Sequence, residues 1–262
     1  MTQRIALGIE YDGSRFSGWQ MQAHGTRTVQ AVMQQALSIV ADHAVQLTCA
    51  GRTDTGVHAT GQVVHFDCAS TRELKAWVMG ANAHLPNDVC VHWAREVDDE
   101  FSARFSAVMR AYRYIILNRR ARSALQHGRV SWIYDTLDVN AMQTAAQALL
   151  GEQDFSSFRS AACQATHARR YMESIELTRE ADYILVDIRA NAFLHHMVRN
   201  IVGSLLVIGR GEQPQSWLGE LLELRDRTRA GPTAPPDGLY LVSVEYPQHY
   251  QLPLSGVLPR FA

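Results

Sequence analysis

The chain has 262 residues, of which 47% are hydrophobic and 19% are charged, with 25 basic and 26 acidic side chains. This is the composition of an ordinary folded protein, and the length suffices for one large domain or two small ones that need no disulfide or metal to stabilise a core. Collagen, coiled coil and wholesale disorder are excluded.

No segment predicts insertion into a membrane. The longest uncharged apolar stretch, residues 201–209, is too short to cross a bilayer, and residues 1–13 lack the apolar core of a signal peptide. We therefore expect a cytoplasmic protein without a membrane partner. The cysteines are scattered without a Cys-x-x-Cys pair, which disfavours a disulfide framework and a zinc site and predicts reduced thiols. They are Cys49, Cys68, Cys90 and Cys163.

Hydrophobic periodicity predicts a mixed succession of strands and helices. Residues 4–11 alternate apolar side chains on one face, which is typical of a half-buried strand, and apolar residues follow at helical spacing after Thr28. The other predicted strands cover 46–50, 62–66, 89–96, 107–117, 174–179, 183–191 and 239–246, with helices near 72–84, 138–150, 194–208 and 215–224.

The order of these elements favours an α+β fold, because strands and helices do not alternate regularly as they do in a doubly wound sheet. Two halves of similar element content predict an N-terminal α+β domain at 1–105 and a C-terminal α+β domain at 106–247. Residues 248–262 are expected to form a tail.

Charge is unevenly distributed along the chain. Of the 25 basic residues, 24 are arginine, and only Lys75 is lysine. Residues 101–134 contain seven arginines and no acidic residue. A near-neutral net charge argues against a nucleic-acid partner, but a local charge of +7 predicts a basic patch that suits one.

Asp54 lies in a glycine-bounded loop, residues 51–56, which makes it a candidate nucleophile or base. Arg52 and His58 are close in sequence, and the flanking glycines allow a bulky ligand to approach the backbone. The alternative is that Asp54 only caps its own turn, as aspartate often does beside glycine.

Arg199 lies on the narrow polar stripe of the apolar helix predicted at 194–208. No acidic residue occurs from 188 to 211, so a buried guanidinium here needs a carboxylate from elsewhere in the chain, and Asp54 is a candidate. Such a pair would lower the pKa of Asp54. A solvated or backbone-bonded Arg199 is the alternative.

Arginine and tyrosine alternate along the strand Arg110-Ala111-Tyr112-Arg113-Tyr114. Period 2 places both tyrosines on one face and Arg113 on the other. Tyrosine with cationic neighbours suits stacking on a base next to its phosphate, although these tyrosines, Tyr114 above all, also fit a role as core aromatics.

Metal and nucleotide motifs are missing. The chain has no G-x-S-x-G, H-E-x-x-H, G-x-G-x-x-G or Walker lysine. His195 and His196, adjacent on the predicted helix, point about 100° apart and are poorly placed to chelate one metal.

Six motifs together resemble the tRNA pseudouridine synthase A family, in order, from about residue 4 to 246. They are Tyr11-Asp12-Gly13 with Gly18-Trp19-Gln20, Gly51-Arg52-Thr53-Asp54-x-Gly56-Val57-His58-Ala59, Ala103-Arg104-Phe105-Ser106-Ala107, Tyr112-Arg113-Tyr114, His195-His196-Met197-Val198-Arg199-Asn200, and Gly238-Leu239-Tyr240-Leu241. The resemblance implies two ferredoxin-like domains with largely antiparallel sheets and a basic active-site cleft between them. It also implies a homodimer that needs no cofactor or metal and isomerises uridine at positions 38, 39 and 40 in the tRNA anticodon arm.

The resemblance assigns roles to individual positions. Asp54 matches the catalytic aspartate, Tyr112 the tyrosine on the target base, and Arg199 the basic partner of the aspartate. Arg52 matches the residue that enters the space left by the flipped base, and Leu239 the aliphatic wall of the pocket. We further expect His58, Arg110 and Arg113 to contact the RNA substrate.

Two positions depart from the family pattern: Thr55 replaces the usual alanine, and Met21 stands where arginine is frequent. Two other functions fit parts of the sequence. A non-catalytic tRNA-binding protein would use the arginine patch without Asp54, and a metal-dependent nucleic-acid hydrolase would use Asp54 but lacks a second carboxylate in that loop.

Overall fold

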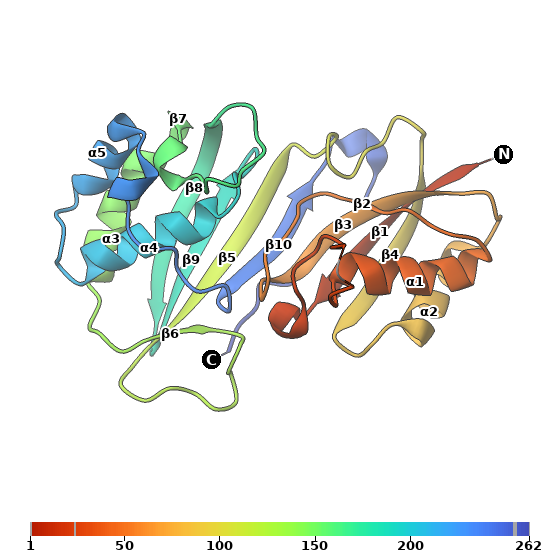
Figure 1. Ribbon diagram of the computed structural model, residues 1–262, viewed down its shortest axis with the longest axis horizontal. Helices are drawn as coiled ribbons and strands as arrows, with labels where there is room; N and C mark the ends of the chain where they lie inside the picture. The colour runs from red at the N-terminus through yellow and green to blue at the C-terminus, as the bar shows by residue number, and fades with distance from the viewer. Residues whose placement is uncertain (1, 24, 254–255, 262) are drawn as a thin grey trace. The chain divides into compact units, whose positions relative to one another are not determined.

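A computed structural model describes residues 2–23, 25–253 and 256–261 of the chain (Figure 1). Its α-helices and strands form a mixed α and β structure whose strand pairs are mostly antiparallel, as the sequence predicts. The chain separates into two compact units. The first comprises Met1–Val108 and Tyr240–Pro259, and the second comprises Met109–Leu239 and Arg260–Ala262.

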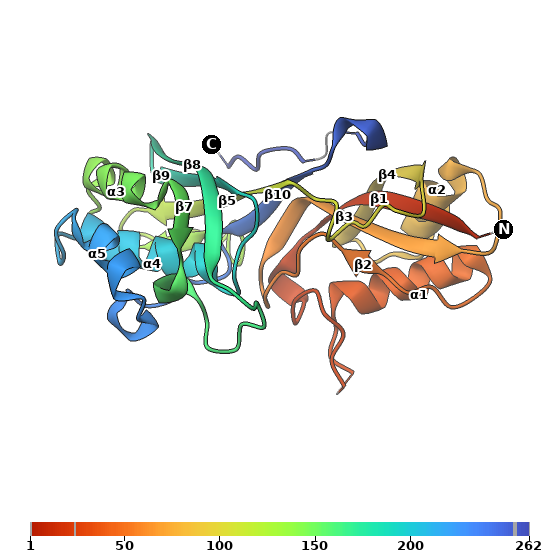
Figure 2. The same cartoon turned by 90° about the horizontal axis from the view of Figure 1, so that it is seen from above.

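The sheet of the first unit has the strand order β4-β1-β3-β10, with β2 paired to β3. Its strands are β1 (Gln3–Tyr11), β2 (Thr48–Cys49), β3 (His58–Cys68), β4 (Val89–Val97) and β10 (Leu239–Glu245). β1 is antiparallel to both β3 and β4, and the three strands run side by side in Figures 1 and 2. β10 is parallel to β3, with Tyr240 opposite His58.

Two helices complete this unit, α1 (Val29–Ala41) and α2 (Leu74–His84). Thr28 begins α1 because its side chain accepts a hydrogen bond from the Ala31 N–H, as the sequence predicts. The helices pack against each other, and the Trp77 ring of α2 meets the edge of the Phe66 ring of β3, with centroids 5.0 Å apart. Apolar side chains buried between helices and sheet stabilise the unit.

The second unit has the strand order β5-β9-β8-β7, all antiparallel neighbours, and β6 is parallel to β5. Its strands are β5 (Met109–Asn118), β6 (Ser131–Ile133), β7 (Gly151–Asp154), β8 (Arg169–Glu180) and β9 (Tyr183–Ala190). Its helices are α3 (Val139–Ala146), α4 (Met197–Gly209) and α5 (Trp217–Leu224). Figure 1 shows the three helices together in this unit, and α3 packs against α4, α5 and β8.

Several boundaries differ from the sequence prediction. The helix predicted at 194–208 begins at Met197, because His196 adopts a left-handed conformation with φ 62°. His195 and His196 therefore precede the helix, and the prediction that both lie on it is wrong. The helix predicted at 138–150 is α-helical only to Ala146 and continues as a 3₁₀ turn to Leu149.

Residues 240–253 belong to the first unit. β10 pairs with β3, although the sequence prediction places residues 239–246 in the C-terminal domain at 106–247. In the predicted tail, the Tyr250 ring meets the edge of the Phe101 ring, with centroids 4.9 Å apart. Among the described residues, no helix is both long and apolar enough to cross a bilayer.

Candidate functional site

Asp54 lies in a tight turn that leads into β3. The Val57 N–H donates to the Asp54 carbonyl at 3.1 Å, and Gly56, at the third position of this turn, has φ 81°. That angle favours glycine, because a side chain would strain the left-handed conformation. Asp54 as a whole residue is neither fully buried nor fully exposed.

A buried polar network lies under this loop. The Gln62 amide contacts both backbone groups of Gly51, donating to its carbonyl at 2.6 Å and accepting from its N–H at 3.4 Å. Gln62 also donates to the Tyr11 hydroxyl at 3.4 Å, and Tyr11 is 2.8 Å from the Thr53 hydroxyl. All three side chains are buried. The residue just before Asp54 is therefore fixed from β1 and β3.

The segment after β1 supports the same loop from its other side. The Trp19 N–H donates to the Thr53 carbonyl at 3.0 Å, and the Gly56 N–H donates to the Phe16 carbonyl at 3.3 Å. A Cβ on Gly18, whose φ is 84°, would lie 2.8 Å from the Thr53 carbonyl oxygen. Gln62 has no signal in the sequence that marks it as part of the site. Tyr11, Gly18 and Trp19 are marked only by their place in the family motif.

His58 is buried at the start of β3. Its Nδ1 accepts from the Gly13 N–H at 3.0 Å and is 3.3 Å from an Asp12 carboxylate oxygen, and its ring stacks on Tyr240 at 4.5 Å. One nitrogen cannot accept from Gly13 and donate to Asp12 together, so the Gly13 bond belongs to the ring with Nδ1 unprotonated and the Asp12 bond to the ring with Nδ1 protonated. Hydrogen bonding from His58, followed by the N–H and hydroxyl of Ser14, holds the pKa of Asp12 well below its usual range. The expected contact of His58 with substrate stays a prediction.

Arg199 lies near the start of α4, and its guanidinium contacts the loop that precedes β10. Its Nε donates to the Ala234 carbonyl at 2.9 Å, and the Ala234 N–H donates back to the Arg199 carbonyl at 3.0 Å. This close approach requires Gly203, because a Cβ there would overlap the Pro232 carbonyl oxygen. The contact with Ala234 uses only the Nε donor of a guanidinium that carries further donors on its terminal nitrogens.

β5 carries the alternating tyrosines and arginine. Tyr112 is 8% exposed, and its ring meets the edge of the Phe193 ring with centroids 4.9 Å apart. Tyr114 is fully buried and donates to the Pro235 carbonyl at 2.8 Å, so the interpretation as a core aromatic is confirmed for this residue. For Tyr112, stacking on a base and packing as a core aromatic both stay predictions.

Arg113 is buried on the opposite face of β5. Its guanidinium makes two hydrogen bonds of 2.7 Å to the carboxylate of Asp187, which is its directly opposite neighbour on β9. A bidentate ion pair of this kind is strong and geometrically specific. Its fixed partner indicates a structural role for Arg113, and its predicted substrate contact stays a prediction.

The remaining predicted site residues differ in burial and in hydrogen bonding. Arg52 is exposed, Leu239 is buried, and Arg110 donates to the Asn191 carbonyl at 2.8 Å. The first unit contains Asp54, Arg52 and His58, whereas the second contains the remaining predicted site residues. Those are Arg199, Tyr112, Arg110, Arg113 and Leu239.

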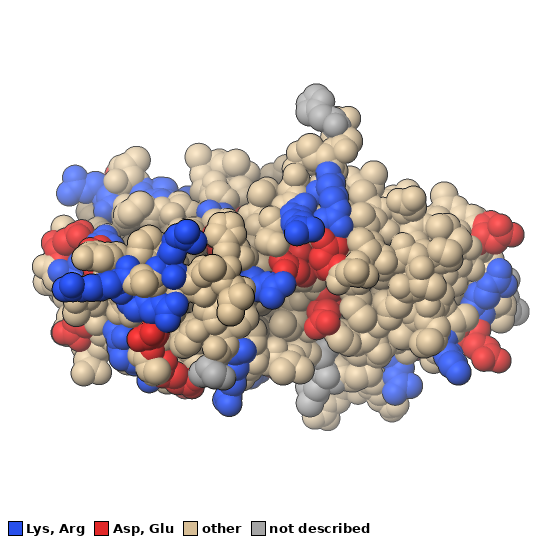
Figure 3. Space-filling model, turned by 90° about the horizontal axis from the view of Figure 1, so that it is seen from below, with Lys and Arg blue, Asp and Glu red and all other residues tan. Residues whose placement is uncertain are grey.

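The arginines of residues 101–134 differ in their exposure and their contacts along the segment. Arg110 and Arg113 have contacts within the second unit, as does Arg119, which pairs with Asp182 at 3.4 Å. The arginines from Arg119 onward are exposed on the loop between β5 and β6. Those are Arg119, Arg120, Arg122 and Arg129. Figure 3 shows basic side chains spread among fewer acidic ones at its left, where the second unit lies. Exposed arginines of this kind suit phosphate contacts.

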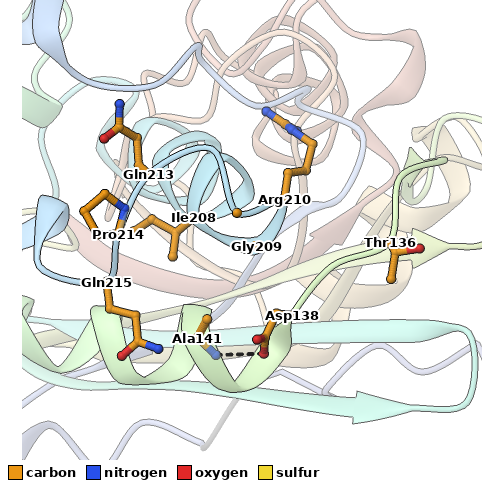
Figure 4. A pocket seen from close by; sticks show the side chains of 10 residues that line it. Thr136, Asp138, Ala141, Ile208, Gly209, Arg210, Gln213, Pro214 and Gln215 are labelled. Atoms are coloured by element: carbon orange, nitrogen blue, oxygen red, sulfur yellow. Dashed lines mark hydrogen bonds between the residues drawn. The ribbon is translucent and has the colours of Figure 1, made fainter.

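An open pocket of about 400 Å³ lies between α3 and the end of α4 (Figure 4). Its acidic residue, Asp138, accepts a hydrogen bond from the Ala141 N–H and so caps α3. None of the predicted site residues lines this pocket. Its acidic Asp138 caps α3 and its basic Arg210 pairs with Glu212, so both have structural partners, and we place the functional site at the Asp54 loop.

Comparison with known proteins shows the family to which the chain belongs. The family described as tRNA pseudouridine synthase matches residues 8–106 and 145–247. The protein is 55% identical to tRNA pseudouridine synthase A of Shewanella loihica and 56% identical to that of Shewanella sp. strain MR-4, in each case over 98% of both chains. A solved chain from a Cbf5-Nop10-Gar1 complex aligns with 90% of this chain and 57% of its own length at 10% identity and a TM-score of 0.34, too low to support a structural argument. From the match over most of its length and the identity to these relatives, the chain belongs to the tRNA pseudouridine synthase A family.

Proposed function

We propose that this protein isomerises uridine to pseudouridine at positions 38, 39 and 40 of the tRNA anticodon arm. The observation that carries the proposal is the loop of Asp54, whose backbone is held by buried contacts while Asp54 itself is partly exposed. Such a preorganised carboxylate suits nucleophilic or base chemistry. Membership of the family supplies the reaction and the RNA substrate.

The reaction moves one bond without any change of redox state. The bond from uracil N1 to C1′ breaks, the base rotates, and C5 bonds to C1′ as the C5 proton leaves for solvent and N1 takes up a proton. No atoms are lost, so the chemistry needs no cofactor. Asp54 starts it by attacking the nucleoside or by removing a sugar proton, and Tyr112 or a water takes the C5 proton.

The target base must leave its stack before this reaction, at a cost of roughly a few kcal/mol. We propose that Arg52 fills the vacated space, that Leu239 and Tyr112 hold the base, and that Arg110 contacts phosphate. We also propose that Asp54 and Arg199 act together in a cleft between two ferredoxin-like domains. Asp54 belongs to the first unit, and Arg199 lies on α4 of the second.

The decisive test is release of tritium from tRNA labelled at uridine C5. We expect the protein to release tritium without added metal, and Asp54→Asn to release none while it still binds tRNA. Asp99→Asn, an exposed change in the same unit, is the matched control. Release by Asp54→Asn at the original rate would refute the role of Asp54. tRNA binding without release by the unchanged protein would instead favour a non-catalytic tRNA-binding protein.

The pairing with Arg199 has its own test. If the guanidinium supports Asp54, Arg199→Met releases tritium more slowly than the unchanged protein while it still binds tRNA. The rate of tritium release measures the loss. A rate equal to that of the unchanged protein would contradict the pairing.

We propose finally that the protein acts as a homodimer in the cytoplasm. Sedimentation equilibrium over a range of protein concentrations tests the dimer, and a single monomeric species would refute it.

A further inference from the structure

Three side chains with metal-binding atoms meet at the edge of the sheet in the first unit. They are Glu10 of β1 and Cys90 and His92 of β4, which is the edge strand of that sheet. One carboxylate oxygen, the Cys90 Sγ and one His92 nitrogen all lie within 4.8 Å of one another, and the Glu10 Oε2 is 3.1 Å from the His92 Nε2. None of these residues belongs to the Asp54 site.

The register of the two strands explains why these side chains share a face. Glu10 is directly opposite Cys90, and His92 is two residues further along β4, so it points to the same side. The pairing then shifts, because Ile9 is opposite Val91 while Gly8 is opposite Trp93. His92 is the extra residue of this β-bulge, and bulges of this kind redirect side chains locally.

The bulge is supported by its neighbours. Trp93 lies directly over Gly8, where a Cβ would overlap the indole ring. Val91 is fixed to α2 by Asn82, whose amide accepts from the Val91 N–H and donates to its carbonyl, both at 2.8 Å. The backbone that carries Cys90 and His92 is thereby held from both faces of the strand, so the two ligands are positioned before any ion binds.

We propose that Glu10, Cys90 and His92 form a binding site for Zn²⁺. A thiolate, an imidazole and a carboxylate are the three donor types that zinc takes in proteins, at about 2.0–2.3 Å from each atom, and a water completes the tetrahedron. The three ligand atoms already lie within 4.8 Å of one another, and none of the three side chains is buried. On binding, the Cys90 thiol gives its proton to solvent, and the two negative ligands neutralise the charge of the ion.

A search for sequence motifs does not find this site, because its ligands come from two distant segments of the chain. Cys90 and His92 are separated by one residue, and Glu10 is 80 residues earlier, so no Cys-x-x-Cys or His-x-x-x-His spacing exists. The bound ion would join the edge strand β4 to β1 just before Tyr11, whose hydroxyl supports the Asp54 loop. Its role is to stabilise this edge, and the reaction itself does not use it.

The experiment titrates the full chain, stripped of metal by chelator, first with Zn²⁺ and then with Co²⁺. We expect one equivalent of Zn²⁺ to bind with a dissociation constant in the micromolar range or tighter. Co²⁺ should give the near-ultraviolet charge-transfer band of a cobalt–thiolate bond. Cys90→Ser should remove this band, and His92→Ala and Glu10→Gln should each weaken Zn²⁺ binding by about tenfold or more.

Matched controls are Cys163→Ser and His84→Ala, a partly exposed thiol and an exposed histidine outside the cluster. Both should bind Zn²⁺ as the unchanged protein does. Thermal unfolding without metal checks that every variant is folded, and Zn²⁺ should raise the midpoint of the unchanged protein but not of Cys90→Ser. Absence of binding in the micromolar range, or a Co²⁺ band that persists in Cys90→Ser, would overturn the proposal.

Discussion

The Gln62 amide is bonded to both backbone groups of Gly51, at 2.6 Å to the carbonyl and 3.4 Å to the N–H. Gln62 is fully buried in β3, and Gly51 opens the loop that carries Asp54. One amide side chain thus replaces the strand pairing that the Gly51 backbone would otherwise need. The position of Asp54 relative to the sheet depends on this contact.

Gln62→Leu should slow the reaction more than it weakens tRNA binding. The change leaves the backbone groups of Gly51 without these partners, which costs about 1–3 kcal/mol of stability. A displaced loop should lower kcat roughly 10-fold to 100-fold with little change in KM, because a small misplacement of a reacting group is costly. Tritium-release kinetics measure both constants. Gln35→Leu, on the exposed side of α1, is the control, and an unchanged kcat in Gln62→Leu would contradict the assigned role.

Gly203→Ala should destabilise the second unit and reduce activity together. A methyl group would overlap the Pro232 carbonyl oxygen and push the loop away from α4, which breaks the paired contact of Arg199 with Ala234. We expect a loss of about 2–4 kcal/mol in the free energy of unfolding by urea. Gly219→Ala in α5 is the control, because its Cβ would lie 3.7 Å from that of Ala148 and alanine favours helix by up to about 1 kcal/mol. Equal stability of Gly203→Ala and the unchanged protein would show that the loop adapts freely.

Local features of the fold are readable from the sequence. Alternation over residues 4–11 predicts β1, and Thr28 before an apolar repeat predicts the start of α1, because strand period and helix capping depend on neighbours a few residues apart. The turn at Asp54 follows from Gly56 for the same reason. These predictions are confirmed.

Features that depend on distant partners are not readable in this way. The partner of Arg113 is Asp187, 74 residues later, and β10 pairs with β3 across most of the chain. The start of α4 was misplaced because a left-handed histidine, His196, leaves no mark on hydrophobic periodicity. Gln62 looks like any polar residue of a strand until the loop that it contacts is placed beside it.

Acid should destabilise the protein partly through His65. Burial, followed by the positive charge of Arg4, lowers the pKa of His65 to about 4, and its Nδ1 accepts from the Ala103 N–H at 3.1 Å. Between about pH 6.5 and pH 4 the unfolded chain therefore binds more protons at this residue than the folded chain, so stability falls as pH falls through this window. The loss should be on the order of 2 kcal/mol.

His65→Gln tests this origin, because its amide oxygen can still accept from Ala103 but does not titrate. Urea unfolding at several pH values should show a flatter dependence between pH 6.5 and pH 4 in the variant than in the unchanged protein. His43→Gln, a partly exposed histidine after α1, is the control and should keep the original slope. Equal slopes for the unchanged protein and His65→Gln would assign the acid sensitivity to other groups.

The arginines of residues 101–134 should separate into structural and RNA-binding positions. Arg113→Met leaves the Asp187 carboxylate without its two-pronged partner, and we expect a loss of about 2–4 kcal/mol in the free energy of unfolding. The lower end of this range is favoured, because Asp187 retains contact with solvent. The salt dependence of tRNA binding should stay nearly unchanged in the folded fraction of this variant.

The double variant Arg120→Ala with Arg122→Ala should behave in the opposite way, because both side chains are exposed on the loop before β6. Stability should change by less than about 0.5 kcal/mol. The slope of the logarithm of the tRNA association constant against the logarithm of salt concentration should become shallower by about 0.7–0.9 for each phosphate that the variant no longer neutralises. Binding isotherms at several salt concentrations measure the slope. Only a residue that displaces counterions from phosphate can change this slope. If Arg113→Met makes the slope shallower and the double variant does not, then Arg113 contacts the RNA and the loop arginines do not.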